Sequence, residues 1–575
     1  MDIKRLASWR SLLLGLAVLG LVAAACGGNE PPKPPGPAEE QVLRLRLQAE
    51  PKTIDPHLSN VISEASLIKP LFAGLFTYDE GAKIVPNLAT ELPTVANGGV
   101  SADGLTYSIK IRDGAKWSDG KALTASDFVY SLQRALDPEL AGPYASSYYS
   151  IVGARDYNKA FGSTKSPKTP TAAELESLRE GVGVSASGES TVVYQLTQPT
   201  PSFLNHLALW TAFPVRQDVI EEHGANWTEA ENIVGNGAFV LAEWSHDLRV
   251  VFEPNQYWHG EAAKLSQITV QFIGDDAAAF AAYQAGEIDS VIVPAANRRQ
   301  VSDVNSTLFE ELVIEPDLRT FAVFINNQAA PFNNKLVRQA LGHAIDRNAY
   351  VEGVLQGAGI TTTSWIPAGM PGHDASIGSQ YEFDASKAKD LLAQAGYVDG
   401  EGFPKVTFVM VNSESNRIAG QFVQSQLKEN VGIVSEFEYI DGKAYGQRVF
   451  GERDYQVTIQ SWSADWPYPD NWLPELFGSE SSSNIFNYSN PEFDALMAKA
   501  AAETDDAKRL EFYGKGHKLM IDDAGLVPLY NRVSYVLVKP WVQDLVITSL
   551  DGAIKGDYHL SQTWIAAPST AVAAD

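Results

Sequence analysis

The residues best suited to chemistry lie together in residues 461–473, which read SWSADWPYPDNWL. Within this stretch, Asp465 lies between Trp462 and Trp466. A carboxylate among aromatic rings suits a cationic group, because the carboxylate pairs with the charge, the ring faces attract it, and the rings exclude the water that would screen both. The same residues also suit an Asx-type turn packed on a small aromatic cluster. The stretch alone leaves a binding site and a structural turn open.

The chain is expected to enter this stretch as an extended strand. Residues 455–460, YQVTIQ, alternate with the period of two that is typical of strands. Pro467 and Pro469 then remove backbone donors and end the strand. We therefore expect Asp465 close to a strand end.

The N-terminus has the pattern of a signal peptide over residues 1–25. Lys4, Arg5 and Arg10 precede an apolar run that ends at Ala25. The run is about 14 residues long, which is shorter than the ~20 that a membrane-spanning helix needs.

Cys26 is the only cysteine of the chain, so no intramolecular disulfide is possible. Residues 22–27, VAAACG, resemble a bacterial lipobox, in which a peptidase cuts before the cysteine and the thiol carries a diacylglycerol. Ala23 stands where most such motifs have leucine. A simple cleavage site with an incidental cysteine is the alternative. Residues 26–40 are rich in Gly, Pro and Glu, so we expect a lipid-anchored, flexible tether there.

The rest of the chain has the composition of a globular protein, with 45% hydrophobic and 20% charged residues. Its length exceeds a single core, so about two or three domains are expected. The formal net charge of −26 argues against binding to nucleic acid or to an anionic membrane face. Contact with a membrane is therefore expected only through the lipid anchor.

Helices and strands alternate along this body, which predicts an α/β architecture. Thr124 and Asp127 have the spacing of a capping box that opens a helix. Residues 162–190 are poor in large apolar side chains and are predicted to form a surface excursion. Strand patterns occupy residues 43–47, 107–111, 191–196, 268–272 and 406–411, and helix patterns occupy residues 66–76, 277–285, 335–345, 418–429 and 508–521.

The motifs of catalysis and cofactor binding are missing from the sequence. It contains no phosphate-binding loop with Lys-Ser/Thr, no G-x-S-x-G and no H-E-x-x-H, and its nine histidines lack metal-ligand spacing. We therefore expect that the protein is not an enzyme and that it has no cofactor and no metal site. A secreted hydrolase that uses Asp465 and Asp470 as paired carboxylates is the alternative from another class of protein.

Many stretches between residues 42 and 542 resemble one known family, the oligopeptide-binding proteins of peptide ABC importers within the extracellular solute-binding proteins of family 5. The stretches that carry this resemblance are IDPH from Ile54, DGAKWSDGKALTASDFVYSLQRALDPE from Asp113, PYAS from Pro143, NIVGNGAFVLAEW from Asn232, GEID from Gly286, INNQ from Ile325, PFNNKLVRQAL from Pro331, AIDR from Ala344, WSADW from Trp462, YSNPEFDALM from Tyr488 and LVKPWV from Leu537.

The resemblance implies an α/β, periplasmic-binding-protein-like (type II) fold with mixed sheets and three lobes that close by a hinge over a buried ligand cleft. Lobe I would comprise residues 41–75, 215–292 and 530–575. Lobe II would be the inserted residues 76–214, and lobe III would be the opposing residues 293–529.

The resemblance also implies where a ligand would bind. Asp465 would bind the N-terminal ammonium of a peptide. The residues expected to line the cleft, or to hydrogen-bond the peptide as an added strand, are Trp462, Ser461, Ser463, Ala464, Tyr144, Asn60 and Ile62. Two positions depart from the pattern of the relatives, because Asn60 lies where an acidic residue can stand and Ile459 where a basic residue can help to bind the peptide's carboxylate.

These features predict an extracytoplasmic, monomeric lipoprotein that captures short peptides and delivers them to the permease of an ABC importer. Within the same family, the alternative ligands are dipeptides, oligosaccharides and metal complexes. The hydrolase with Asp465 and Asp470 remains the alternative outside the family.

Overall fold

The computed structural model describes residues 36–163, 166–481, 483–503 and 505–567. The predicted signal peptide and Cys26 lie outside the described residues. The end of the predicted tether is described, and its backbone pairs with the C-terminal segment. The Ala38 N–H donates to the Ile565 carbonyl at 2.8 Å, and the Ala567 N–H donates to the Gly36 carbonyl at 2.8 Å. The described end of the predicted tether is therefore held against the body of the protein.

A four-stranded mixed sheet combines the start of the chain with its middle. β1 is parallel to β11, and β10 is antiparallel to both β11 and β9. Leu43, Leu45 and Leu47 alternate along β1 and point into the core, as the sequence pattern predicts. The elements of this part are β1 (Val42–Leu47), α1 (Ile62–Leu71), α6 (Gln217–His223), β9 (Phe239–Ser245), β10 (Arg249–Pro254), β11 (Gln267–Phe272), α7 (Asp276–Ala285), α8 (Arg298–Val301), β19 (Val542–Gln543) and β20 (Trp564–Ile565).

Residues between α1 and α6 form a second core around Trp117, whose side chain is fully buried. The Thr124 N–H donates to the Asp127 carboxylate at 2.7 Å, so the predicted capping box does open α2. The predicted surface excursion contains a helix, α4, which buries none of its side chains. The elements are β2 (Phe76–Tyr78), β3 (Ile84–Pro86), β4 (Thr106–Lys110), α2 (Ala125–Ala135), α3 (Ala154–Asn158), β5 (Gly162–Ser163), β6 (Ser166–Pro167), α4 (Ala172–Glu180), β7 (Val184–Ala186), β8 (Thr191–Gln195) and α5 (Phe203–Ala208).

A seven-stranded mixed sheet organises the C-terminal half. Its strand order is β12-β18-β13-β17-β15-β16, with β14 also paired to β18. Along β13, Val323 and Ile325 contribute to one core and Ala322 and Phe324 to another, so the sheet is covered on both faces. The elements are β12 (Ser290–Ile292), β13 (Leu312–Ile325), α9 (Lys335–Ala344), α10 (Arg347–Gly353), β14 (Gly359–Thr361), α11 (Ala385–Gln394), β15 (Val406–Val411), α12 (Glu414–Val431), β16 (Ser435–Ile440), α13 (Gly442–Tyr445), β17 (Val457–Ser463), α14 (Pro474–Phe477), α15 (Pro491–Ala502), α16 (Asp506–Asp522) and β18 (Leu526–Val538).

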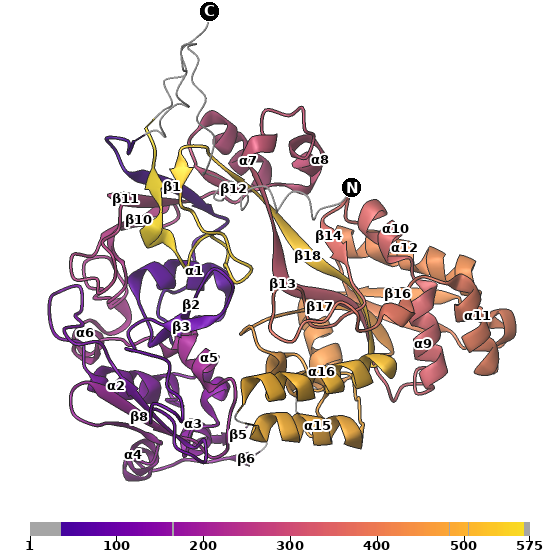
Figure 1. The fold of residues 1–575 in the computed structure, drawn as a ribbon, viewed down its shortest axis with the longest axis horizontal. Helices are drawn as coiled ribbons and strands as arrows, with labels where there is room; N and C mark the ends of the chain where they lie inside the picture. The colour runs from indigo at the N-terminus through magenta and orange to yellow at the C-terminus, as the bar shows by residue number, and fades with distance from the viewer. Residues whose placement is uncertain (1–35, 164–165, 482, 504, 568–575) are drawn as a thin grey trace, which may run out of the picture.

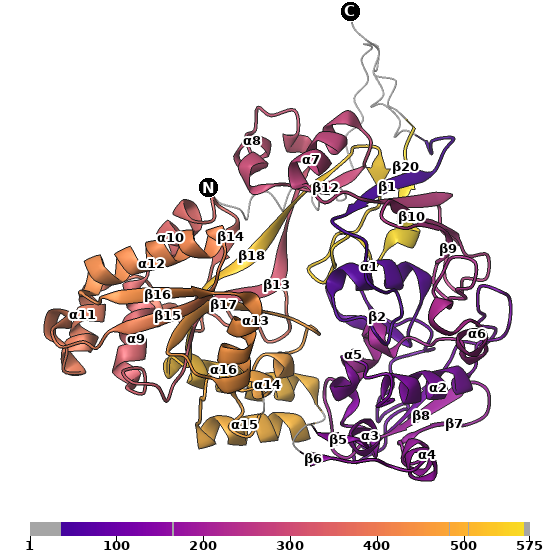
Figure 2. The ribbon, with the colours of Figure 1, turned by 180° about the vertical axis from the view of Figure 1, so that it is seen from behind.

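Two long strands, β13 and β18, connect the C-terminal half to the rest of the molecule (Figure 1). At one end β18 pairs with β12, where Ser290 lies opposite Val538. At the other end β13 pairs with β17. The predicted boundary between residues 529 and 530 lies inside β18, so the two lobes share a continuous strand. Seen from behind, α15 and α16 approach the N-terminal half near α5 (Figure 2), and both halves line a cavity of about 480 Å³ there.

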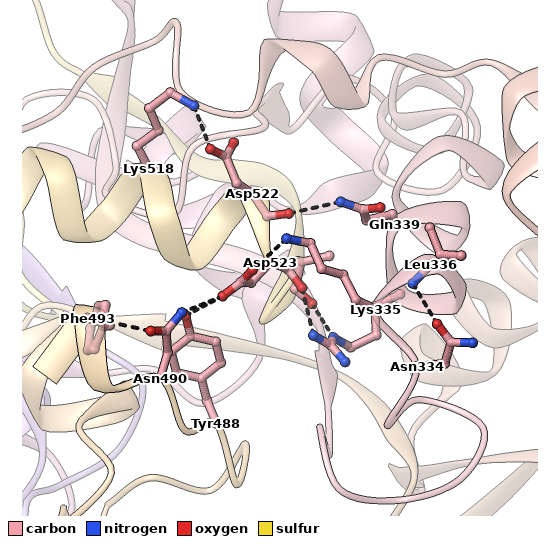
Figure 3. Close-up of polar contacts among 12 residues, drawn as sticks. Asn334, Lys335, Leu336, Gln339, Tyr488, Asn490, Phe493, Lys518, Asp522 and Asp523 are labelled. Atoms are coloured by element: carbon pink, nitrogen blue, oxygen red, sulfur yellow. Dashed lines mark hydrogen bonds and ion pairs between the residues drawn. The ribbon is translucent and has the colours of Figure 1, made fainter. Parts of the chain in front are cut away.

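A polar network fixes the junction between α16 and β18 to two other helices (Figure 3). The carboxylate of Asp523 accepts hydrogen bonds from Lys335 at 2.7 Å, from Asn490 at 2.8 Å and from Tyr488 at 2.9 Å. Asn490 is also the N-cap of α15, because its side chain accepts from backbone N–H groups of that helix. The network therefore connects α9, α15 and α16 at one point. None of the described helices is long and apolar enough to span a membrane.

Candidate ligand-binding cleft

The strand β17 carries the chain to Asp465, which lies two residues beyond the strand's last residue. Pro469 then begins a short 3-10 helix that ends at Asn471. The Asp465 N–H donates to Asn471 Oδ1 at 3.0 Å, and Asn471 Nδ2 donates to Asp465 Oδ2 at 3.3 Å. The Trp462 Nε1–H also donates to Asn471 Oδ1, at 3.3 Å. The amide of Asn471 therefore holds the loop together, and one oxygen of Asp465 takes part through a single long bond.

The carboxylate of Asp465 faces a cavity and lacks a cationic partner. No ion pair in the described part of the chain includes Asp465. Its side chain is accessible to solvent, but the walls of the cavity remove much of its hydration. This desolvation, together with the charge of Glu475, raises the pKa of Asp465 to about 6, although the hydrogen bond from Asn471 opposes the change. An anion in this position would be stabilised by a cation that enters the cavity.

Three of the predicted site residues line this larger cavity, which has a volume of about 810 Å³. Tyr144 comes from the N-terminal half, and Trp462 and Asp465 come from the C-terminal half. The ring of Tyr144 packs edge-on against Trp210 with centroids 5.5 Å apart. Burial, with a contribution from the charge of Asp465, raises the pKa of Tyr144 to about 12, so its hydroxyl stays protonated and can donate a hydrogen bond.

Three other predicted residues line a second cavity of about 290 Å³. Ile62 is at the start of α1, Ser463 is the last residue of β17, and Ala464 follows it. Ser461 and Asn60 line neither cavity among the described residues. The Asn60 N–H donates to the carboxylate of Glu64 at 3.0 Å, so this backbone group already has a partner.

One edge of β17 is free over the residues that precede Asp465. The Ala464 N–H donates to the Leu318 carbonyl, and the register pairs Ser463 with Arg319 and Ser461 with Phe321. In an antiparallel pair, alternate residues bond to the partner strand. The backbone groups of Ser461 and Ser463 therefore point away from β13. On that side, β15 pairs with β17 only at Val457.

The Ser461 N–H on this free edge is occupied by a side chain of the same strand. It donates to Gln460 Oε1 at 2.9 Å. The amide of Gln460 therefore stands where a ligand's carbonyl would bind if a peptide extended the sheet.

The two carboxylates of the hydrolase alternative, Asp465 and Asp470, both line the larger cavity. Asp470 Oδ1 accepts from the Trp466 Nε1–H at 2.7 Å, and burial raises the pKa of Asp470. The described residues contain no cluster of His, Cys, Asp and Glu that could hold a metal ion.

Two features of the cleft were missed by the reasoning from sequence. The ring of His206 packs edge-on against Trp466 at 4.5 Å, so the two halves touch beside Asp465. Arg319 lies next to Ser463, and its Nε–H donates to the Ser463 hydroxyl. Both pairs join residues that are more than a hundred positions apart, and only the strand register and lobe packing bring them together.

The molecule has two α/β parts that are joined by long strands, with cavities between them. This is the architecture of a solute-binding protein of the type II periplasmic-binding fold. Comparisons with known proteins agree with this class. A structure of the periplasmic murein tripeptide-binding protein in its unliganded open form matches with a TM-score of 0.78 and 28% identity, over 93% of this chain and 99% of that chain. The Haemophilus influenzae OppA complex with the peptide RPPGFSPFR matches with a TM-score of 0.68 and 27% identity, over 92% and 100% of the two chains. The TM-score is thus higher with the open murein tripeptide-binding structure than with the peptide complex of OppA.

Residues 83–484 match the model of the bacterial extracellular solute-binding proteins, family 5. The periplasmic oligopeptide-binding protein of Salmonella typhimurium is 31% identical over 544 residues, which are 92% of this chain and 94% of that protein. The chain belongs to the bacterial extracellular solute-binding proteins of family 5.

Proposed function

We propose that this protein captures short peptides outside the cytoplasm and delivers them to the permease of an ABC importer. Its similarity to proteins named for oligopeptide binding supports the ligand class. The observation that carries the proposal is the unpaired carboxylate of Asp465 at the end of a free strand edge. The carboxylate would bind the peptide's ammonium group, and the edge would bind its backbone whatever its side chains are.

The relative position of these two features supports one direction for the peptide. Beyond Asp465 the chain turns into the 3-10 helix that starts at Pro469, so the open edge runs only from Ser463 back toward Ile459. A peptide whose ammonium meets Asp465 must therefore run antiparallel to β17. Trp462 and Tyr144 would then flank its N-terminus.

The proposal is tested by titrating the protein with peptides while following tryptophan fluorescence. Denaturation and refolding should first remove any ligand that co-purifies. We expect saturable binding of tri- to pentapeptides with a free amine, and binding at least about tenfold weaker for their N-acetylated forms, because acetylation removes the charge that pairs with Asp465. Equal binding of both forms would contradict the assignment of Asp465.

The other classes of function give different results in the same experiment. A neutral oligosaccharide that protects the protein against thermal unfolding, with no response to any peptide, would favour a sugar-binding member of the family. Peptide or glycan turnover that disappears in Asp470→Asn would favour the hydrolase. We expect neither result, because the relatives are named as binding proteins.

We further propose that the mature protein is a monomer anchored to the membrane through a diacylglycerol on Cys26. The sequence pattern before Cys26 supports this part of the proposal. Expression with a labelled fatty acid should label the wild-type protein and not Cys26→Ser. Release of an unlabelled wild-type protein, cut at the same position, would instead indicate simple signal-peptide cleavage.

A further inference from the structure

The smaller cavity is positively charged, although the protein as a whole carries a formal net charge of −26. Strands β13, β17 and β18, the start of α1 and residues 549–555 form its walls, so it lies between the two halves. The charged residues that line it are Arg46, Arg319, Arg532, Lys555, Asp317 and Asp551. Four cations thus face two carboxylates in a volume of about 290 Å³.

Both carboxylates are already engaged by other groups. Asp317 pairs with Arg532 at 3.2 Å and with Lys555 at 3.5 Å, and it accepts from the Ser534 hydroxyl at 2.8 Å. Asp551 accepts from the backbone N–H groups of Thr548 and Gly556, both at 2.7 Å. The charge of Asp317 acts on Arg319, but among the described residues neither carboxylate forms an ion pair with Arg46 or Arg319.

Arg319 is the cation that this arrangement leaves without a carboxylate. In the described part of the chain, no Asp or Glu lies within ion-pair distance of its guanidinium, and Arg46 by contrast pairs with Asp276 at 2.8 Å. Arg319 is half-buried, and its Nε–H donates to the Ser463 hydroxyl. This bond turns the guanidinium toward the end of β17, where the proposed ligand would begin.

The strand register relates Arg319 to one residue of the ligand. Arg319 lies opposite Ser463, and residues that lie opposite each other in a sheet place their side chains on the same face. A ligand residue that pairs with Ser463 from the free edge would place its side chain on that face too. It would lie two strands, about 10 Å, from the backbone of Arg319, a distance that the arginine side chain and an acidic side chain can span together.

We propose that this cavity binds the acidic side chain of the peptide residue that pairs with Ser463, and that Arg319 is the partner of its carboxylate. The inference rests on the proposed function and adds a preference to it. Backbone recognition along β17 makes affinity largely independent of sequence, whereas this cavity selects for Asp or Glu at one position near the N-terminus.

The test uses alanine tetrapeptides with amidated C-termini, in which Glu or Gln occupies position one, two or three. The side chain is then the only carboxylate of each peptide. We expect the Glu form to bind at least about fivefold more tightly than the Gln form at one of the first two positions, because a charge-assisted pair replaces a neutral contact. The ratio should fall to about one in Arg319→Gln and be partly retained in Arg319→Lys.

Arg249→Gln is the control, because Arg249 lines neither cavity and pairs with Glu243 at 3.1 Å, so its loss should leave the Glu-to-Gln ratio unchanged. If Gln peptides bind and Glu gives no advantage at any position, the inference is wrong and the proposed function stands. The inference is also wrong if the advantage persists in Arg319→Gln. The all-alanine tripeptide is also compared with a free C-terminal carboxylate and with an amide. If the free carboxylate binds more tightly, this gain requires Arg319 and a Glu side chain gives no gain, the cavity binds the end of the peptide and the side-chain assignment is wrong. No binding of any peptide would instead contradict the proposed function.

Discussion

At the scale of single residues, Asp465 distinguishes this cleft from an ordinary loop. It could have been the residue that closes an Asx-type turn, but the amide of Asn471 makes three of the contacts that hold this loop. One side chain therefore fixes the loop, and another remains available for a ligand.

Replacing this carboxylate tests its proposed role directly. We expect Asp465→Ala to lose peptide affinity by at least about tenfold, which corresponds to ~1.4 kcal/mol. Calorimetry with a free-amine tripeptide measures the change. Asp470→Asn is the matched control, because Asp470 lines the same cavity but already accepts from Trp466. Unchanged affinity in Asp465→Ala would refute the assignment.

The pKa of Asp465 also predicts how binding depends on pH. In the free protein this pKa is about 6, and only the ionised form pairs with an ammonium group, so the complex has a lower pKa than the free protein. Protonation therefore opposes binding, and affinity should fall by up to about tenfold per pH unit below pH 6. Affinity should also fall above about pH 8, where the peptide's own amine loses its proton.

Calorimetry between pH 5 and pH 9, in steps of one unit, measures both limbs of this profile. Asp465→Asn should flatten the acid limb and also reduce the alkaline one, because the charge that favours the peptide's ammonium form is gone. If the acid limb has the same slope in Asp465→Asn as in the wild type, a group other than Asp465 causes it.

At the scale of elements, the sequence predicts most of the strands and helices that form the cleft. The alternation of residues 455–460 predicts β17, and the prolines predict its end. Thr124 predicts the start of α2, because a capping box needs only neighbouring residues. Local patterns of this kind identify an element without knowledge of its neighbours.

The pairing between elements could not be predicted in this way. Arg319 contacts Ser463 because β13 and β17 have one particular register, and nothing near Arg319 in the sequence encodes it. For the same reason, the predicted lobe boundary falls within β18, a single strand that runs from Leu526 to Val538. Alternation shows which face of a strand is buried but not which strand lies beside it.

The free edge of β17 leads to a prediction about Gln460. Its Oε1 accepts from the Ser461 N–H, which a ligand carbonyl would need. Gln460→Ala removes this competitor, so we expect peptide affinity to rise by about twofold to tenfold, the equivalent of one hydrogen bond.

Gln456→Ala is the matched control for Gln460→Ala. It removes a glutamine near the start of the same strand, whose side chain bonds to Ala330 and Thr407, and affinity should not change. Weaker binding in Gln460→Ala would mean that its side chain contacts the ligand.

The junction between α16 and β18 gives a prediction about stability. Burial works to raise the pKa of Asp523, but hydrogen bonds from Lys335, Asn490 and Tyr488 outweigh it, so this pKa lies below its ordinary value. A carboxyl with a lowered folded-state pKa stabilises the protein at neutral pH, and this stabilisation is lost as the pH falls through that pKa. Asp523→Asn should lower Tm by roughly 2–5 °C at pH 7.5 and by less near pH 3.

Asp522→Asn serves as the control in the same thermal scans. Asp522 is adjacent in sequence, and its ion pair with Lys518 is more exposed, so the loss should be smaller (Figure 3). Equal losses in the two variants would show that the network around Asp523 contributes no more than a surface pair.

At the scale of the whole molecule, two long strands carry the connection between halves that each have their own core. Such an arrangement allows the halves to move as rigid bodies about β13 and β18. Ligand binding in the cavities between the halves would draw them together.

Small-angle scattering measures this closure. Saturation with a peptide should decrease the radius of gyration, and the same peptide concentration should leave Asp465→Ala unchanged. A radius that stays constant while calorimetry shows saturation would mean that binding occurs without closure.

The pairing of residues 36–38 with residues 565–567 determines which half would move relative to the membrane. Both segments lie with β1, so an attachment anywhere before Gly36 restrains the half that contains the four-stranded sheet. The half that carries Asp465 would then move relative to the half through which the chain is attached. A pair of fluorophores, one at Ala567 and one on α11, should report a change in their separation during ligand binding.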